Sequence, residues 1–183
     1  WASGWKSPIY CDNRKTLSHP KVRKVIQEDF VRRIKAKYPE AEVIAGVATG
    51  AIALGVLVAE AMDLPFIYIR SSAKKHGMGN QVEGAWKKGQ KVVVIEDLVS
   101  TGGSSLAAVE ALREEELDVL GMFAIFTYGF PIADENFTKS AVELETLSNY
   151  FKLLDLAVEA EYISSSQKIA LETWRNNPAI WQQ

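Results

Sequence analysis

Residues Glu96–Ser105 have the types and spacing needed to bind a sugar that carries a phosphate. Two adjacent acids, Glu96 and Asp97, are followed by a small, hydroxylated turn that contains two glycines. Carboxylates accept hydrogen bonds from sugar hydroxyls. Backbone N–H groups of such a turn hold phosphate when a helix begins beside them. This stretch therefore predicts a site for a phosphorylated sugar.

The segments on either side of this stretch place the acids at the end of a strand. Val92–Ile95 is an apolar run rich in β-branched residues, which predicts a strand buried on both faces. Leu106–Glu116 is rich in Ala, Leu and Glu and predicts a helix. We expect the strand to end where the two acids begin and the turn to open the helix.

A second strand, turn and helix precede this unit. Val43–Val47 predicts a buried strand, Ala51–Met62 a helix and Phe66–Ile69 a further strand. The turn after the first strand consists of Ala48, Thr49 and Gly50. This order predicts a parallel sheet with a right-handed crossover. Small residues in the turn let backbone amides approach an anion, or they serve close packing of strand on helix.

The stretch from Arg70 to Gly89 is polar, rich in glycine and locally basic. Four of its cationic residues, Arg70, Lys74, Lys75 and His76, lie within seven positions. A long irregular segment in a compact domain is usually functional or disordered. We interpret it as a lid that carries positive charge onto a polyanionic substrate, with a flexible hairpin of solvated charges as the alternative.

The remaining pattern completes an α/β domain. We expect a short strand at Ile9–Cys11 and a helix from about Pro20 to Lys37. Further elements are expected as strands at Val119–Thr127 and Val142–Leu147, a turn at Tyr128–Pro131, and helices at Asn149–Glu161 and Ser166–Arg175. No repeat or second domain is evident, so we expect a single domain over residues 1–183.

Composition narrows the class of protein. The 183 residues are 48% hydrophobic and carry a net charge of −2, which argues against a broadly electrostatic nucleic-acid binder. The single cysteine excludes an internal disulfide framework and favours a reducing compartment, so we expect a cytoplasmic protein. No Cys/His cluster has metal-ligand spacing, and no apolar run is long enough to cross a bilayer. Because the chain opens on Trp1 without Met, we expect a segment to precede it.

Three motifs carry a family resemblance. Val92–Ser105 resembles the phosphoribosyl diphosphate (PRPP) signature of the type I phosphoribosyltransferases. Ser3–Arg14 is similar to the N-terminal motif of the orotate phosphoribosyltransferases, and Lys74–Gly84 is similar to their catalytic loop. The resemblance implies a central, mainly parallel sheet flanked by helices, with a small hood from the N-terminal segment. It also implies transfer of the phosphoribosyl group from PRPP to orotate, giving orotidine 5′-phosphate and diphosphate in pyrimidine synthesis.

The same resemblance implies a role for individual residues. The implied catalytic residues are Lys74, His76 and Asp97. The implied PRPP-binding residues are Arg70, Lys74, Lys75, His76, Glu96, Asp97, Leu98, Val99, Ser100, Thr101, Gly102, Gly103 and Ser104. The implied orotate-binding residues are Ser100, Lys6, Tyr10, Cys11 and Arg14, and the implied diphosphate loop is Ala48, Thr49 and Gly50. Within the PRPP set, the resemblance implies that the acids bind the ribose hydroxyls and that the turn wraps the 5′-phosphate.

Partners and a cofactor follow from the resemblance as well. It implies a homodimer in which residues Arg70 to Gly84 act across the interface, and we expect Mg²⁺ to accompany the polyanionic PRPP. No protein metal cage is expected. The chain departs from the family at two points: Ala2 stands where some members have Lys, and no Arg lies between Leu120 and Lys139. We therefore take Lys6 and Arg14 as candidates for holding the orotate carboxylate.

Three alternatives stay open at this point. A purine or uracil phosphoribosyltransferase would share Val92–Ser105 but would not need the N-terminal motif or the glycine-rich loop. A non-catalytic regulator would bind PRPP and nucleic acid, and the net charge and the absence of a helix-turn-helix pattern count against it. The third alternative is a dehydrogenase-like domain, and the absence of a dinucleotide-binding fingerprint from the sequence counts against it.

Overall fold

The computed structural model describes residues 5–71 and 81–181 and shows an α/β fold built on one six-stranded sheet. The strands are β1 (Val43–Val47), β2 (Phe66–Ile69), β3 (Val82–Glu83), β4 (Lys91–Val99), β5 (Asp118–Thr127) and β6 (Leu144–Asn149). They lie in the order β3-β2-β1-β4-β5-β6. Every neighbouring pair is parallel except β2 and β3. The prediction of a mainly parallel sheet is confirmed.

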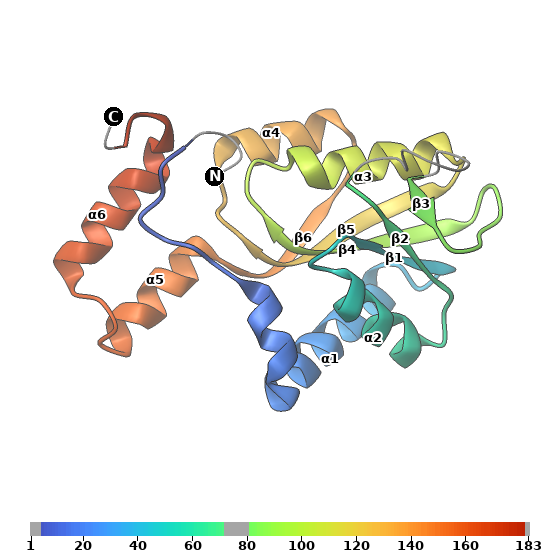
Figure 1. The fold of residues 1–183 in the computed structure, drawn as a ribbon, viewed down its shortest axis with the longest axis horizontal. Helices are drawn as coiled ribbons and strands as arrows, with labels where there is room; N and C mark the ends of the chain where they lie inside the picture. Colours follow the sequence, from blue (N-terminus) through green and yellow to red (C-terminus); the bar gives the residue numbers. More distant parts are fainter. Residues whose placement is uncertain (1–4, 72–80, 182–183) are drawn as a thin grey trace.

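Helices cover both faces of the sheet (Figure 1). The helices α1 (Pro20–Lys37) and α2 (Ile52–Met62) lie on one face, and α3 (Gly103–Glu114) and α4 (Pro131–Lys139) lie on the other. Two further helices, α5 (Tyr150–Glu159) and α6 (Ser165–Asn176), lie beyond the β6 end of the sheet. Short 3-10 helices occur at Asn13–Ser18 (η1) and Pro178–Ile180 (η2). No helix formed by the described residues is long and apolar enough to cross a membrane.

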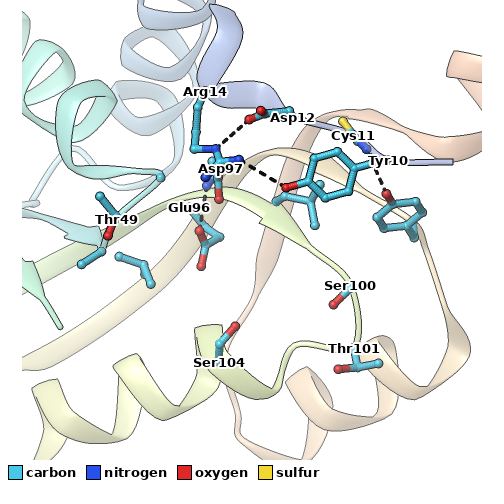
Figure 2. Close-up of a pocket in the computed structure, with 15 residues that line it drawn as sticks. Tyr10, Cys11, Asp12, Arg14, Thr49, Glu96, Asp97, Ser100, Thr101 and Ser104 are labelled. Carbon is cyan, nitrogen blue, oxygen red and sulfur yellow. Dashed lines mark hydrogen bonds and ion pairs between the residues drawn. The ribbon is translucent and has the colours of Figure 1, made fainter. Parts of the chain in front are cut away.

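The order of the strands creates a switch point between β1 and β4. From β1 the chain crosses to β2 on one side, whereas β4, β5 and β6 follow on the other side. Open parallel sheets bind ligands where strand order reverses, at the carboxyl ends of the strands. The turns after β1 and β4 meet there, and Thr49 and Ser100 are drawn in this region in Figure 2.

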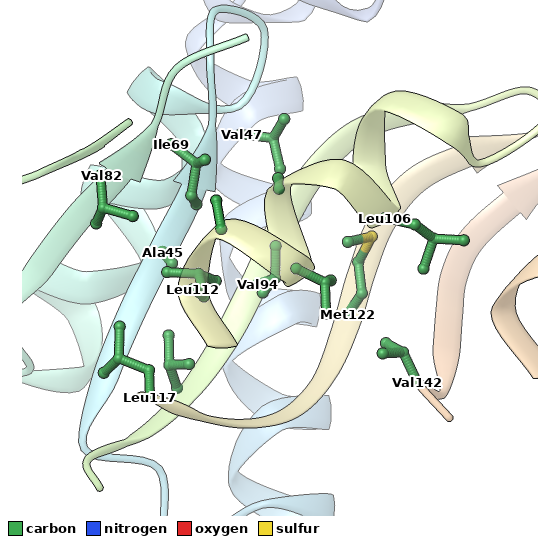
Figure 3. Close-up of a cluster of buried hydrophobic side chains, with 14 of the residues drawn as sticks. Ala45, Val47, Ile69, Val82, Val94, Leu106, Leu112, Leu117, Met122 and Val142 are labelled. Carbon is green, nitrogen blue, oxygen red and sulfur yellow. The ribbon is translucent and has the colours of Figure 1, made fainter. Parts of the chain in front are cut away.

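The central strands are buried on both faces, as their apolar runs predict. In β4, Val92 and Val94 face the cluster under α3, while Val93 and Ile95 face the cluster under α1 and α2. All four side chains are fully buried. Figure 3 shows Val94 packed with Leu106, Leu112 and other members of the first cluster. Burying side chains of this size contributes about 1.5–3 kcal/mol each, so these strands hold the switch point rigidly.

Two expectations about the elements need correction, and two elements were missed. The strand β4 continues to Val99, so the two acids lie within it, because Glu96 and Leu98 still pair with β5. The expected strand at Ile9–Cys11 does not form. The helix α4 and the two-residue strand β3 were not predicted from the sequence.

A third apolar cluster joins the two ends of the chain. It gathers buried residues at the carboxyl end of β5 and on the C-terminal helices. Its buried members are Phe126, Tyr128, Phe130, Tyr150, Leu154 and Trp174. Trp5 and Ile9 of the N-terminal segment pack against it, so that this segment is held beside the carboxyl edge of the sheet.

Candidate active site

A pocket of about 650 Å³ lies at the carboxyl ends of β1 and β4 (Figure 2). Its volume falls in the range of small-molecule sites, about 300–1,000 Å³. It is lined from the N-terminal segment, from β1 and its turn, from β4 and its turn, from the start of α3, and from the residue that follows β5. The lining residues are Tyr10, Cys11, Asp12, Arg14, Val47, Ala48, Thr49, Gly50, Glu96, Asp97, Leu98, Ser100, Thr101, Ser104 and Tyr128.

The two acids have different surroundings. Glu96 is only 5% exposed; its Oε1 accepts from the Asp97 N–H at 2.8 Å and its Oε2 accepts from the Ser105 hydroxyl at 3.0 Å. Burial, with the neighbouring Asp97 carboxyl as the next cause, raises the pKa of Glu96 to about 8. The Ser105 hydroxyl opposes this rise because it donates to the charged form. Both acids face the pocket from one strand, so together they present oxygen acceptors to a ligand.

The turn after β4 leads directly into α3. Gly102 has a φ of 83°, a left-handed conformation that favours glycine, and a Cβ there would lie 2.9 Å from the Phe137 ring. The helix begins at Gly103, so its unpaired N–H groups lie beside the pocket. Asn136 Nδ2 donates to the Thr101 carbonyl at 3.0 Å and holds the turn from α4. This geometry is suited to binding an anion.

The turn after β1 packs against the acids. Its Ala48–Thr49 peptide bond is cis. A Cβ at Gly50 would lie 2.2 Å from Asp97 Oδ2, so only glycine allows the two turns to approach this closely. The backbone of Gly50 and the carboxyl of Asp97 are therefore in direct contact across the pocket.

The N-terminal segment forms the remaining wall. Arg14 Nε donates to Asp12 Oδ1 at 2.7 Å, and the Arg14 guanidinium also donates to the Tyr10 hydroxyl at 3.2 Å. Asn13 Nδ2 donates to the Asp97 carbonyl at 2.7 Å, which ties the segment to β4. Burial, followed by the charge of Asp97, raises the pKa of the Cys11 thiol.

The structure brings together most of the residues singled out from the sequence. Lys6, Arg70 and Val99 do not line the pocket, and Gly102 and Gly103 shape its turn without lining it. Arg70 pairs instead with Glu83, at 3.4 Å. Lys74, Lys75 and His76 lie outside the described residues. In the parts of the chain that are described, no group of three or more His, Cys, Asp or Glu side chains is placed to hold a metal ion.

Sequence reasoning missed two kinds of site residue. Asp12, Val47 and Tyr128 line the pocket but were not singled out. Three more residues hold the site through polar side chains: Asn13, Ser105 and Asn136. Asn13 and Ser105 lie inside the motifs Ser3–Arg14 and Val92–Ser105, so the sequence offered a signal for both. For Asn136 no local signal exists, because it reaches the turn from a separate helix.

Comparison with known proteins gives the family. A profile of the phosphoribosyl transferase domain matches residues 16–152. The orotate phosphoribosyltransferase of Phocaeicola vulgatus is 54% identical over 182 residues, which cover 100% of this chain and 86% of the relative. The orotate phosphoribosyltransferase of Streptococcus pneumoniae is 53% identical, covering 100% of this chain and 87% of the relative.

Solved structures agree with this result. The crystal structure of orotate phosphoribosyltransferase from Aeropyrum pernix matches with a TM-score of 0.77 and 27% identity, covering 90% of each chain. The structure of Leishmania donovani UMP synthase matches with a TM-score of 0.82 and 27% identity. In that case the match covers 96% of this chain and 37% of the larger protein. The chain belongs to the orotate phosphoribosyltransferases, within the phosphoribosyl transferase domain family.

Proposed function

We propose that this chain transfers the 5-phosphoribosyl group from PRPP to orotate, forming orotidine 5′-phosphate and diphosphate. The proposal rests mainly on one observation: the acidic pair, the turn that leads into α3 and the N-terminal segment all line the same pocket. The first two features suit the sugar and its phosphate, and the third supplies a separate wall for a base. The 53–54% identity to curated orotate phosphoribosyltransferases supports the same reaction.

The PRPP half of the pocket lies between the two turns. Glu96 and Asp97 accept hydrogen bonds from the ribose 2′- and 3′-hydroxyls. The turn Thr101–Ser104 binds the 5′-phosphate through backbone N–H groups and hydroxyls at the start of α3. The turn Ala48–Gly50 takes the diphosphate beside the start of α2.

The base half lies against the N-terminal segment. Tyr10, Cys11 and Ser100 form its walls. Among the described residues that line the pocket, Arg14 is the only one with a cationic side chain. Arg14 therefore remains our candidate for the orotate carboxylate. Lys6 does not line the pocket, so its side chain would reach orotate only after a movement of the segment. Raised orotate KM in Arg14→Ala, with unchanged PRPP KM, is the expected result.

The reaction breaks the bond from the anomeric carbon to diphosphate and forms a bond from that carbon to the base nitrogen, whose proton passes to the released diphosphate or to solvent. Its transition state has oxocarbenium character, and negative charge gathers on the leaving diphosphate. Cations that close over the site neutralise this charge and keep water from hydrolysing the sugar. We assign this task to Arg70, Lys74, Lys75 and His76. Orotate is anionic and needs little activation.

We also propose that Mg²⁺ enters with PRPP. Hard oxygen donors suit this ion, so we propose that oxygens of PRPP and water hold it, without a cage of protein ligands. Bound there, Mg²⁺ would neutralise charge on PRPP. We place the reaction in the cytoplasm, where the single cysteine stays reduced.

The loop is proposed to act in the partner subunit of a homodimer. Support comes from Arg70, which pairs with Glu83 and does not line the pocket of its own chain. Lys74→Ala and Asp97→Asn should each lower kcat by on the order of 10²-fold or more. Mixing the two inactive variants should restore part of the activity, because one hybrid site then has both residues. Mixtures that stay inactive after subunit exchange would show that the loop acts within its own chain.

The reaction is tested by ultraviolet absorbance of orotate with PRPP and Mg²⁺. Orotate should be consumed with matching release of diphosphate, whereas uracil and adenine should not react. Turnover of adenine or uracil in place of orotate would disprove the choice of base. No turnover with any base, together with tight nucleic-acid binding, would indicate a regulator.

A further inference from the structure

The two ends of the described chain are joined by a hydrogen bond beside the base half of the pocket. Trp174 of α6 donates its indole N–H to the Lys6 carbonyl at 3.0 Å, although 168 residues separate them. The Trp174 side chain is fully buried. Figure 1 shows the N-terminal segment passing alongside α6 before it reaches η1. The last helix therefore holds a backbone atom of the segment that forms the base wall.

A second set of contacts connects α6 to the same wall. Arg175 donates to the Tyr128 carbonyl at 3.4 Å and to the Gly129 carbonyl, which fixes the turn after β5. The Tyr128 hydroxyl in turn accepts from the Cys11 N–H at 3.4 Å. The Trp174 and Tyr128 rings meet edge to face with centroids 5.9 Å apart. Successive residues of α6 thus support the segment directly and through Tyr128.

The described part of the N-terminal segment depends on such contacts because it forms no regular structure before η1. Residues 5–12 belong to no helix or strand, and their local side-chain bonds include the Ser7–Ile9 pair. The segment and α6 also share a second property. The phosphoribosyl transferase profile matches residues 16–152, so residues 5–15 and all of α6 lie outside the part that defines the broad family. The turns that face PRPP lie inside it.

We propose that Trp174 is a positioning residue for the base site: it fixes the segment from Lys6 to Arg14 and so sets the affinity for orotate. This inference rests on the proposed function, which assigns the segment to orotate. The turn after β4, which faces PRPP, is held by the pairing of β4 with β5 and by Asn136 of α4. Loss of the indole N–H should therefore weaken orotate binding and leave PRPP binding unchanged.

The first test is Trp174→Phe, which keeps an aromatic ring and removes the donor. We expect orotate KM to rise between about 2- and 12-fold, the range for one hydrogen bond, with PRPP KM within 2-fold of wild type. Site-specific replacement of Trp174 by 3-benzothienylalanine keeps the ring shape and removes only the N–H. It serves the same test should the smaller phenyl ring unfold the protein.

Tyr150→Phe is the matched control. Tyr150 is equally buried in the same cluster, and its hydroxyl donates to the Leu171 carbonyl at 3.2 Å, within the C-terminal helices. This variant also removes one buried donor from an aromatic side chain, but not one that contacts the N-terminal segment. We expect it to lower the melting temperature without changing orotate KM.

Hydrogen exchange provides a readout that does not depend on catalysis. Amides of residues 5–14 should exchange faster in both Trp174 variants than in wild type, and at the wild-type rate in Tyr150→Phe. Equal changes of orotate KM and PRPP KM in Trp174→Phe would overturn the inference, as would an unchanged orotate KM. Failure of the proposed function is distinguishable, because the wild-type protein itself would then not consume orotate.

Discussion

The contact between Gly50 and Asp97 allows a sharp test of how the two turns build the site. In Gly50→Ala, the new Cβ would lie 2.2 Å from Asp97 Oδ2, 2.4 Å from Cγ and 2.8 Å from Oδ1. An ordinary contact begins at 3.4 Å, so the carboxyl must retreat by about 1 Å or the turn must open. Displacements of this size at a reacting centre cost about 10²-fold in rate. We therefore expect kcat/KM for PRPP to fall about 10²-fold.

The matched control is Gly89→Ala, which separates the contact from the general effect of replacing glycine. Gly89 has a φ of 79° and open space at its Cβ, and it does not line the pocket. Strain in the left-handed region should lower its free energy of unfolding by about 1–2 kcal/mol without changing kcat/KM. Initial rates of orotate consumption at varied PRPP measure both variants. A Gly50→Ala enzyme within 2-fold of wild type would refute the reasoning.

Three further predictions concern the groups that hold the acids and the turn. Ser105→Ala removes the buried hydroxyl that donates to Glu96 Oε2 and should lower the free energy of unfolding by about 1–3 kcal/mol. Urea denaturation measures this loss, and a denaturation midpoint equal to that of wild type would contradict it. Because the pKa of Glu96 rises from 4.5 to about 8 on folding, the folded state binds more protons between these values, so stability should fall as pH rises through that window. Glu96→Gln should flatten this fall, and a slope equal to that of wild type would argue against it. Asn136→Ala removes the hydrogen bond to the Thr101 carbonyl and should raise PRPP KM severalfold with little change in orotate KM. A larger rise in orotate KM than in PRPP KM would contradict the assignment of Asn136 to the turn that faces PRPP.

The sheet could be predicted from sequence because its signals are local. Val43–Val47 and Val92–Ile95 are runs of apolar residues that predict strands buried on both faces, and the small residues after Val47 mark the end of the first strand. The end of β4 could not be predicted in this way. Its acids stay in the strand because β5 continues beside them, and that pairing depends on a segment about 30 residues later in the chain. The two-residue β3 likewise depends on its partner β2.

The site could be predicted as far as its motifs reach. The motifs contain the acids, the turn after β4 and the residues of the N-terminal wall, whereas the turn Ala48–Gly50 was assigned from the family resemblance. The motifs do not contain Asn136, which holds the turn after β4 from a separate helix. They also gave no reason to connect Trp174 with Lys6, because the hydrogen bond joins opposite ends of the chain through a backbone atom. Contacts of this kind leave no local pattern.

The helix α4 was missed although a signal was present. Pro131 stands at its first turn, where a missing N–H is tolerated, and Ala133 and Phe137 form its buried face. We interpreted the preceding Tyr128–Pro131 as a turn and took no helix after it. The omission matters because α4 carries both Asn136 and Phe137, which contact the turn after β4.

The central claim is that one pocket holds the ribose, its phosphate and the base in fixed places. A crystal structure of the protein with orotidine 5′-phosphate tests it most directly. We predict ribose hydroxyls within about 2.6–3.2 Å of the Glu96 and Asp97 carboxylates, the phosphate at Thr101–Ser104 and the base against Tyr10–Arg14. A nucleotide bound with its phosphate away from this turn, or with its base away from the N-terminal segment, would contradict the account.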